Sequence, residues 1–333
     1  MLGHGSGGKM MRELIERLFL PALKGSYPGL GSEDSAVLPM PEIPNGRLAL
    51  TTDTYVVSPL FFPGGNIGDL AVNGTVNDLS MSGAKPLYLT AGFVIEEGFL
   101  FADLFKIVIS MKEAADRASV AIVAGDTKVV ERGKADGVFI NTAGVGVVPA
   151  GLNITAKGLN PGDALLVSGT LGDHGMAVLS RREGLDFEAN IESDTAPLNG
   201  LVADIIAAGE VHALRDPTRG GLASTLVEFA AESGICIVID ESSLPVREPV
   251  RGACEILGLD PLYVANEGKL VVAVPKSCAR DVLAVMRENA CGRESAIIGE
   301  VLAEPAGKVL MKTIIGGTRI VDMLSGEQLP RIC

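Results

Sequence analysis

The feature that most constrains this chain is a Gly-, Pro- and Asn-rich stretch at residues 150–162, which separates two halves of similar organisation. Each half alternates short apolar runs typical of strands with longer segments of helical period. A chain of 333 residues is also too long for one average hydrophobic core. We therefore predict two packed domains, residues 1–155 and 156–320, followed by a tail of residues 321–333.

Strand-like and helix-like segments alternate along both halves of the chain. In the first half, strand-like runs cover residues 47–57, 120–130 and 137–148, and helix-like segments cover residues 9–20, 68–82 and 101–118. In the second half, strand-like runs begin at residue 163 and cover 236–240 and 269–275, and helix-like segments cover 220–233 and 276–289. This alternation predicts an α/β or α+β fold.

The end of the chain has neither period, so we expect residues 322–333 to form an exposed, flexible tail. Extended residues span roughly 3.3 Å each, so the tail reaches about 40 Å and can visit a distant site. Its last residue, Cys333, is an accessible nucleophile if its thiol has the ordinary pKa of about 8.5. An incidental terminal cysteine is the alternative interpretation.

The charge of the chain limits its partners. A net charge of −13 repels nucleic acid and anionic membranes, and no basic stretch overrules it. No basic segment followed by an apolar core opens the chain, and no apolar run approaches the roughly 20 residues that span a bilayer. We therefore expect a cytoplasmic protein that binds neither nucleic acid nor membrane. The same charge repels a nucleoside triphosphate, so ATP needs metal ions beside it.

Several acidic residues follow strand-like runs or lie at helix edges beside small residues: Asp34, Asp53, Asp78 and Asp126. A carboxylate held at a strand end can point into a shared cleft, and several such groups can bind Mg²⁺. Taken alone, each of these aspartates is better explained as a cap of a turn or helix. Only their combination predicts a metal site.

Further polar residues stand at helices. Asn73 and Asn77 lie four residues apart and share one face of the predicted helix 68–82. With the adjacent Asp78 they are costly to bury without partners, which favours a role facing a ligand. The polar segments at residues 173–175 (DHG) and 216–221 (DPTRGG) precede helix-like segments, and each can bind an anion or cap a helix.

The opening residues 3–9 (GHGSGGK) match the spacing of a P-loop but lack the preceding strand and the Ser or Thr after the lysine. They predict either a glycine-rich segment that closes over phosphates through backbone N–H groups and Lys9, or a mobile N-terminus.

Several motifs together resemble one known family over essentially the whole chain. They are TTDTYVV, FFPGGNIGDLAVNGTVNDLSMSGAKP, AGDTKVVE, SGTLGDHG, DPTRGGLA, ANEGKL and the terminal PRIC. The sequence resembles the HypE family of hydrogenase expression/formation proteins, which shares a superfamily with aminoimidazole ribonucleotide synthetase, thiamine-monophosphate kinase and selenophosphate synthetase. The terminal PRIC is the motif that distinguishes the HypE family from the others.

The resemblance implies a two-domain fold like that of aminoimidazole ribonucleotide synthetase, a homodimer formed by the N-terminal domains, and ATP bound near the dimer interface. It implies ATP and Mg²⁺ as cofactors, HypF as a carbamoyl donor and a HypC–HypD complex as a cyano acceptor. The implied reaction is the ATP-dependent dehydration of a carbamoyl group on Cys333 to a thiocyanate. That product supplies the cyanide ligand of the nickel–iron hydrogenase iron centre.

The matching motifs also imply site residues. Cys333 is the implied carrier, and Lys128 and Glu267 are assigned to proton removal, with charges that tune one another if they converge. The residues implied to bind ATP are Lys9, Thr52, Asp53, Asn73, Asn77, Gly125, Asp126 and Asn141. The implied metal ligands are Asp34, Asp53, Asp78 and Asp126.

Two other functions remain open at this point. A different phosphorylating enzyme of the superfamily would act on a diffusible substrate and keep its activity without Cys333. A selenophosphate synthetase uses a cysteine or selenocysteine in its N-terminal half. That function is disfavoured because the first cysteine here is Cys236, in the second half of the chain. A non-catalytic scaffold would use the tail only to dock partners and would consume no ATP.

Overall fold

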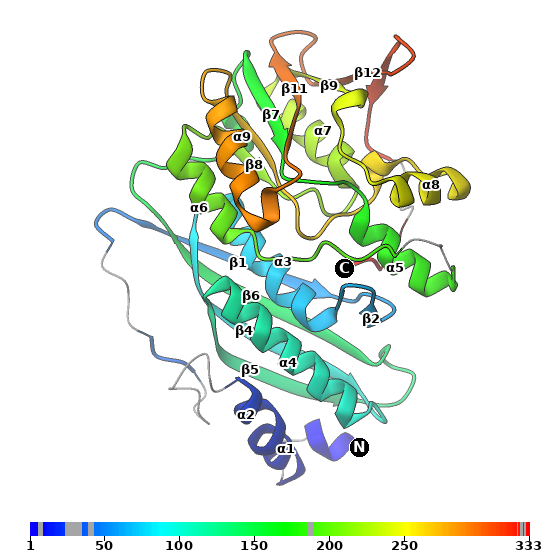
Figure 1. Ribbon diagram of the computed structural model, residues 1–333. Coiled ribbons are helices and arrows are strands. Elements are labelled where there is room, and N and C mark those ends of the chain that lie inside the picture. Colours follow the sequence, from blue (N-terminus) through cyan, green and yellow to red (C-terminus); the bar gives the residue numbers. More distant parts are fainter. Residues whose placement is uncertain are drawn as a thin grey trace.

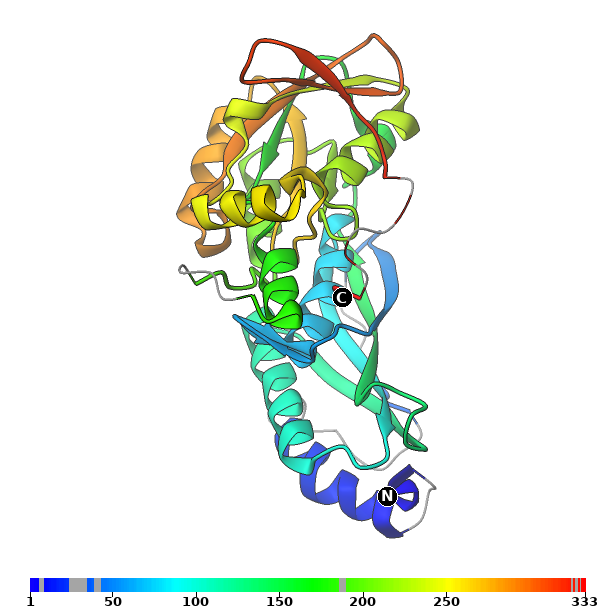
Figure 2. The same cartoon turned by 90° about the vertical axis from the view of Figure 1, so that its right-hand side faces the viewer.

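The computed structural model describes residues 1–5, 9–23, 35–38, 43–185, 190–324, 326, 329 and 331–333. Two domains are stacked end to end, and helix α3 lies at their junction with the C-terminus beside it (Figures 1 and 2). The sheet of the first domain ends at Val148, and the sheet of the second begins at Asp163. The boundary that we place after residue 155 lies between these two sheets.

The first sheet has the strand order β1-β6-β4-β5. Its strands are β1 (Arg47–Tyr55), β4 (Lys85–Glu96), β5 (Ala121–Val130) and β6 (Val138–Val148). Strand β6 pairs antiparallel with β1 and β4, and β4 pairs parallel with β5. Helices α3 (Ile67–Met81) and α4 (Phe101–Ala118) pack on one face of the sheet (Figure 2). The predicted strands and helices of this region are confirmed, the two helices to within one residue at each end.

Strand β4 is not among the strands predicted from the sequence. It contains a proline, which has no N–H group and is unusual inside a central strand. Pro86 stands second in β4, which lies between β6 and β5. The sheet accommodates it through a register shift against β6 between Pro86 and Tyr88.

Smaller elements complete the first domain. The chain opens with η1 (Leu2–Gly5) and a helical segment made of α1 (Lys9–Leu14), a π-helical turn (Ile15–Phe19) and α2 (Leu20–Leu23). The ring centroid of Phe19 lies 4.9 Å from that of Phe93 on β4. The hairpin β2 (Phe61–Phe62) and β3 (Gly65–Asn66) leads into α3. Within the described ranges, no helix is long and apolar enough to cross a membrane.

In the part of the chain that the structure describes, no helix covers the other face of the first sheet (Figure 2). Leu48 and Leu50 on β1 are 55% and 75% exposed. The strand register places Thr54, Asn141, Gly92 and Asp126 in one row across the sheet. Because side chains alternate along a strand, this row faces the same side as Leu50. We call this surface the open sheet face.

The second domain contains a sheet of order β13-β12-β9-β11-β7-β10-β8. Its strands are β7 (Asp163–Val167), β8 (Ala213–Arg215), β9 (Cys236–Asp240), β10 (Val271–Pro275), β11 (Ala296–Leu302), β12 (Lys308–Lys312) and β13 (Thr318–Val321). Neighbouring strands are antiparallel except for the β9–β12 pair. The strands predicted for this half are present as β7, β9 and β10.

Helices cover both faces of the second sheet. The helices on these faces are α6 (Asn199–Ala208), α7 (Gly221–Ser233) and α9 (Ala279–Glu288). Helices α5 (Asp173–Glu183) and α8 (Glu248–Leu257) pack against each other in a separate cluster. Phe229 of α7 belongs to one buried cluster, and Ile205 of α6 and Met286 of α9 belong to another. Short 3-10 turns are η3 (Ala156–Gly158), η4 (Glu241–Ser243), η5 (Pro261–Tyr263) and η6 (Ala290–Gly292).

Helix α3 is buried on nearly every side, and Asp78 is its one residue that is not fully buried. A capping box at Asn66 and Asp69 satisfies its first N–H groups. Glycine allows its close approach to the sheet, because a Cβ atom at Gly74 would lie 2.2 Å from the Tyr55 hydroxyl. Tyr55 is itself 1% exposed and has no room to move. The packing of α3 therefore fixes where β1 lies, and β1 carries Asp53.

Gly74→Ala tests this packing. We expect a net loss of about 1–2 kcal/mol in the free energy of unfolding, because the clash with Tyr55 outweighs the gain in helix propensity. Gly200→Ala in α6 is the matched control, since nothing lies within 4 Å of the added Cβ atom. Chemical denaturation measures both variants, and equal stability of the two would contradict the close approach.

Candidate functional site

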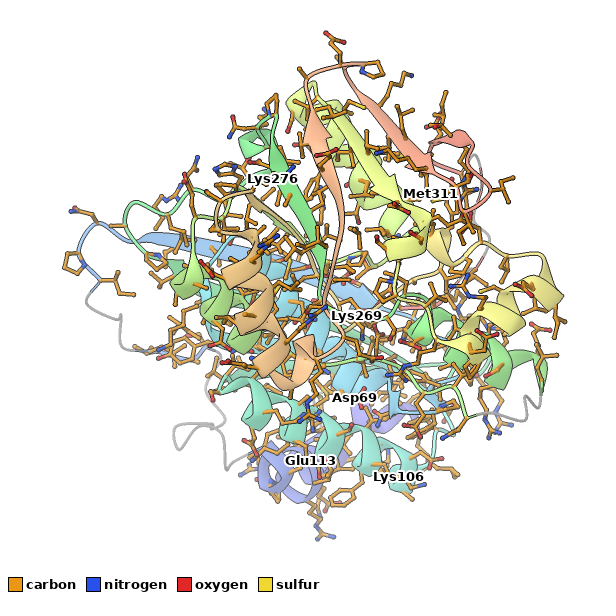
Figure 3. The ribbon with its side chains drawn as sticks, turned by 45° about the horizontal axis from the view of Figure 1, so that its top comes forward. Asp69, Lys106, Glu113, Lys269, Lys276 and Met311 are labelled. Carbon is orange, nitrogen blue, oxygen red and sulfur yellow. The ribbon has the colours of Figure 1, made fainter. Side chains whose placement is uncertain are left out.

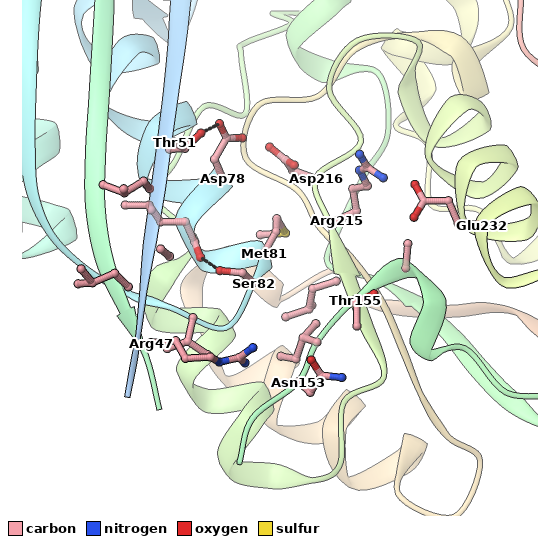
Figure 4. Close-up of a pocket in the computed structure, with 18 of the residues that line it drawn as sticks. Arg47, Thr51, Asp78, Met81, Ser82, Asn153, Thr155, Arg215, Asp216 and Glu232 are labelled. Atoms are coloured by element: carbon pink, nitrogen blue, oxygen red, sulfur yellow. Dashed lines mark hydrogen bonds between the residues drawn. The ribbon is translucent and has the colours of Figure 1, made fainter. Parts of the chain in front are cut away.

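An acidic cluster lies at the junction of the two domains. Asp53 comes from β1, Asp78 from α3 and Asp216 from the segment between β8 and α7. Asp78 and Asp216 line a cavity of about 740 Å³ with Thr51, Arg215 and Glu232 among the other lining residues (Figure 4). The Thr51 hydroxyl donates to Asp78 Oδ2 at 2.9 Å. The charge of Asp53 acts on both of the other carboxylates, so three distant parts of the sequence contribute to one electrostatic cluster. Among the described residues, no three Asp, Glu, His or Cys side chains are already grouped closely enough to hold a metal ion.

The electrostatics of this cluster are unfavourable to charge. Burial, together with the Asp53 carboxylate, raises the pKa of Asp78 to about 6. Burial, followed by the carboxylate of Asp78, raises the pKa of Asp216 to about 7. Carboxylates that repel one another in a partly dry site bind cations readily, because a cation removes both the repulsion and the cost of burial.

Glu267 lies next to the acidic cluster and is 3% exposed. Its backbone N–H donates to Asp194 Oδ1 at 3.0 Å, and its carbonyl accepts from Asn77 Nδ2 at 3.1 Å. Burial and then the carboxylate of Asp216 raise the pKa of Glu267 well above its ordinary value. Its Oε1 atom has no hydrogen-bond partner among the described residues. The backbone of Glu267 is therefore held in place, and one oxygen of its buried carboxyl group has no partner among the described residues.

A buried ion pair supports Glu267. Lys269 Nζ lies 3.1 Å from Asp194 Oδ2, with both side chains largely buried. Figure 3 shows Lys269 near the middle of the molecule, between Asp69 of the first domain and Met311 of the second. An added Cβ atom at Gly268 would lie 1.7 Å from the Asp194 carbonyl oxygen, so only glycine fits between the pair and Glu267.

The C-terminus is docked at the same junction. Val56 N–H donates to the Cys333 carbonyl group at 3.1 Å, and Ser58 N–H donates to the Arg331 carbonyl group at 3.2 Å. Ile332 is 4% exposed and belongs to the core of the first domain. Cys333 also lines a second cavity of about 690 Å³. The last three residues thus lie along the segment that follows β1.

The Cys333 thiol has an unusual environment. Arg219 Nη2 lies 3.6 Å from its Sγ atom. Burial and then the Glu267 carboxyl group raise the pKa of Cys333 to about 11, and Arg219 acts in the opposite direction. The docked sulfur is therefore a neutral thiol near pH 7. It lies close enough to Glu267 and Asp53 for their charges to affect its pKa.

Comparison with known proteins identifies the family. Models of AIR synthase related proteins match in two parts, the N-terminal domain over residues 32–148 and the C-terminal domain over residues 160–312. Carbamoyl dehydratase HypE of Azotobacter vinelandii is 56% identical over 331 residues, which covers 99% of this chain and 96% of the relative. The chain belongs to the HypE family.

Solved structures of the HypE family agree with this assignment. A crystal structure of hydrogenase maturation protein HypE in complex with ATP has a TM-score of 0.95 and 49% identity, and the match covers 100% of this chain and 99% of that one. A crystal structure of a HypE–HypF complex has a TM-score of 0.81 and 52% identity, covering 93% of this chain and 99% of the other. The predicted two-domain fold of aminoimidazole ribonucleotide synthetase type is thereby confirmed.

The structure brings together one part of the site expected for a HypE protein. Asp53, Asp78, Glu267 and Cys333 meet at the domain junction. Asn73 and Asn77 also lie there, but their amides bind the second domain. Asn73 Nδ2 donates to Thr195 Oγ1. The Asn77 side-chain amide binds backbone groups of Ala196, Leu198 and Glu267. These protein partners account for the burial of Asn77, which no longer argues for a ligand. ATP binding by both residues stays a prediction.

Another part of the expected HypE site lies apart from the junction. Asp126 and Lys128 are on β5, at the opposite edge of the sheet from β1, and Lys128 Nζ lies 2.7 Å from Asp126 Oδ2. Within one chain, therefore, Lys128 and Glu267 do not converge. Asn141 is on the open sheet face, where its Nδ2 donates to Thr52 Oγ1, Thr54 Oγ1 and the Asp53 carbonyl. Gly125 is also on the edge strand β5, where it pairs with Ala91 of β4.

Two further expected residues lie at or beyond the limits of the described structure. Lys9 is exposed at the start of α1, at the end of the molecule away from the second domain (Figure 1). Asp34 lies outside the described residues. Their roles toward phosphate and metal stay predictions.

The expectation of an exposed tail is right for residues 322–324 and wrong for Ile332. The aperiodic sequence gave no sign of docking, because the contact is made by backbone hydrogen bonds and one apolar side chain. Flexibility of the tail stays a prediction.

Asp216 and Arg219 are site residues that the sequence reasoning left undecided. Both belong to the DPTRGG segment, which is compatible with either anion binding or a helix cap. The structure places Asp216 in the acidic cluster and Arg219 beside the thiol. The available signal was the juxtaposition of an acid and a base directly before a Gly-Gly helix start.

Asp216→Asn tests the repulsion in the cluster. Asp216 holds its proton more tightly when folded, so it lowers the free energy of unfolding as pH rises from about 4, the ordinary pKa of Asp, to about 7, the value in the folded chain. We expect the variant to lack this loss, so that it gains stability relative to the parent chain across that window. Thermal unfolding without divalent cations measures the difference, and parallel pH profiles would contradict the raised pKa.

Proposed function

We propose that this chain dehydrates a carbamoyl group on Cys333 to a thiocyanate at the expense of ATP, and so supplies the cyanide ligand for nickel–iron hydrogenase maturation. The single observation that carries the proposal is the position of Cys333. Its sulfur is docked beside Arg219, Glu267 and a cluster of acids, inside a junction lined by two cavities. A relative of 56% identity is named carbamoyl dehydratase.

The acidic cluster fits Mg²⁺ and the triphosphate of ATP. Asp53, Asp78 and Asp216 provide oxygen ligands of the kind that Mg²⁺ prefers, and their mutual repulsion is relieved by bound cations. Bound Mg²⁺ would supply charge neutralisation for the phosphates. A HypE structure of 49% identity is described as a complex with ATP. Asp126 and Asp34 are also proposed metal ligands. Within one chain Asp126 lies on the edge strand β5, away from the cluster, and Asp34 lies outside the described residues.

The chemistry explains the need for ATP. The carbamoyl group on sulfur becomes a nitrile only if the carbon–oxygen bond breaks, and oxide is not a competent leaving group. Transfer of the γ-phosphoryl group to that oxygen, with loss of one nitrogen proton, gives an O-phosphorylated imine and ADP. Breaking the carbon–oxygen bond then forms the carbon–nitrogen triple bond and releases phosphate, which takes the second nitrogen proton. Positioning supplies most of the rate enhancement in such phosphoryl transfers.

Glu267 is the proposed acceptor of the first nitrogen proton. Its backbone is held on both sides, and its unpartnered Oε1 is available to a group on Cys333. Burial and the neighbouring carboxylates favour its protonated form in the described structure. Cations at the cluster would cancel that repulsion and lower the pKa of Glu267 toward a range where it can act as a base. Lys128 is proposed to assist from a second copy of the chain.

The proposed partners follow from the same family. HypF is the proposed carbamoyl donor, and a solved structure of 52% identity is described as a HypE–HypF complex. A HypC–HypD complex is the proposed cyano acceptor, and the cytoplasm is the proposed location. Neither a small-molecule kinase nor a scaffold explains a C-terminal thiol docked beside a buried carboxyl group.

Mass spectrometry tests the proposed function. Protein carbamoylated on Cys333 should lose the mass of one water from its C-terminal peptide when ATP and Mg²⁺ are added. Glu267→Gln should bind ATP with unchanged affinity but lose water at least about a hundredfold more slowly, as expected for removal of a catalytic base. Cys333→Ser should neither gain the carbamoyl group nor show donor-dependent phosphate release. ATP-independent loss of water, or an unaffected Glu267→Gln, would contradict the proposal.

A homodimer through the open sheet face is also proposed. The exposed Leu48 and Leu50 would be buried by a second copy, and Asp126 and Lys128 lie on the same face. In such a dimer, Asp126 and Lys128 of one chain would approach the domain junction of the second copy. Within one chain they do not reach the junction.

Leu50→Arg tests the proposed dimer. A charge buried at the centre of the interface should convert the dimer to a monomer in analytical ultracentrifugation at micromolar concentration. Ile315→Arg is the matched control, because Ile315 is 94% exposed in the hairpin between β12 and β13. A monomeric parent chain, or a dimeric Leu50→Arg variant, would exclude this interface.

A further inference from the structure

His174 contacts the docked tail although the proposed chemistry makes no use of it. The residue is the second of helix α5 and is 0% exposed. Its Nε2 atom lies 3.0 Å from the carbonyl oxygen of Ile332, and its Nδ1 atom lies 2.7 Å from Ser193 Oγ. The ring also stands edge-on to Phe62, with ring centroids 5.4 Å apart. A buried imidazole thus links the second domain to the residue before Cys333.

The partners of His174 determine which ring nitrogen carries the proton. A carbonyl oxygen only accepts, so Nε2 must donate to Ile332. In the neutral ring Nδ1 is then an acceptor, and the Ser193 hydroxyl donates to it. Ser193 Oγ in turn accepts from the Thr195 N–H group at 3.2 Å. Burial lowers the pKa of His174, which keeps the ring neutral. The network therefore specifies one tautomer, the one that can hold the tail.

A second side chain of helix α5 holds the preceding carbonyl group. Arg182 Nη2 donates to the Arg331 carbonyl at 2.6 Å, and Arg182 Nε donates to the Ser58 carbonyl at 2.7 Å. Together with the N–H groups of Val56 and Ser58, these contacts engage every carbonyl of the last three residues. The contacts recognise the backbone of the tail, and they leave the Cys333 side chain to point at Arg219.

We propose that His174 is a positioning residue that holds the tail in the docked state in which carbamoylated Cys333 is dehydrated. The inference rests on the proposed function for its consequence in catalysis, but the docking itself does not depend on it. Because the held carbonyl precedes Cys333 directly, loss of this bond loosens the backbone that places the sulfur beside Arg219 and within the electrostatic influence of Glu267. A docked neutral thiol is also a poor nucleophile, so release from His174 favours the state that accepts a carbamoyl group.

A purely structural role predicts something different. If His174 only fills space at the start of α5, its replacement lowers stability without changing the exposure of Cys333 relative to other variants of equal stability. His212 provides the matched control. It is a half-buried histidine with Nδ1 2.7 Å from Asp163 Oδ2, and among the described residues its side chain contacts Asn160, Asp163 and Glu210 but not the tail.

The experiment compares His174→Ala, His174→Gln and His212→Ala in the full chain. The first measurement is the rate at which iodoacetamide alkylates Cys333, followed by mass spectrometry of the C-terminal peptide. The second is the single-turnover loss of water from carbamoylated protein at saturating ATP. One buried hydrogen bond corresponds to about a fivefold to tenfold change. We expect His174→Ala to be alkylated faster and to dehydrate more slowly by that factor, with unchanged affinity for ATP.

The control variants make the outcome decisive. His174→Gln keeps an N–H donor near the position of Nε2 and should restore both rates, whereas His212→Ala should match the parent chain. Ser193→Ala removes the hydroxyl group that donates to Nδ1, so the ring is no longer held in one tautomer. Both rates should therefore shift in the direction of His174→Ala. Parental alkylation and dehydration rates in His174→Ala would overturn the inference. If the parent chain itself fails to lose water with ATP, the proposed function fails, while the alkylation rates still decide the docking role of His174.

Discussion

The repulsion among buried carboxylates at the domain junction is the constraint on which the rest of this structure depends. Burial raises the pKa values of Asp78, Asp216 and Glu267, and neighbouring carboxylates, that of Asp53 among them, raise these pKa values further. A folded chain accepts such a cluster only if the surrounding packing holds it together. In this protein the electrostatic repulsion is compatible with function. Bound cations would offset the charge of the carboxylates, and phosphates would in turn bind the cations.

The holding elements come from both domains. Helix α3 contributes Asp78 and also Asn77, whose side chain binds backbone groups of the second domain, including the carbonyl of Glu267. The buried pair of Asp194 and Lys269 fixes Glu267 from the other side. The docked tail then closes the junction, with Ile332 packed in the core of the first domain and its carbonyl bound by a histidine of the second. Catalytic geometry and domain association therefore use the same contacts.

Much of the fold follows from the sequence, and the reasons for the exceptions are specific. Apolar runs and helical periods predict α3, α4, β1, β5 and β6. Strand β4 is not among the predicted strands, and its pairing with β6 is irregular next to Pro86. Asp53 and Asp78 are predicted for the cluster, and Asp216 is not, because an acid before a helix start has a common structural role. The docking of Ile332 leaves no pattern in the sequence, since the hydrogen bonds that hold the tail are made to its backbone carbonyl groups.

The most direct test of the central claim follows the oxygen atom that must leave. If Cys333 carries a carbamoyl group labelled with a heavy oxygen isotope, phosphorylation of that oxygen at the acidic cluster predicts that the label appears in inorganic phosphate once ATP and Mg²⁺ are added. Mass analysis of the released phosphate gives the answer. Label recovered in water, with unlabelled phosphate, would contradict an O-phosphorylated intermediate at this site.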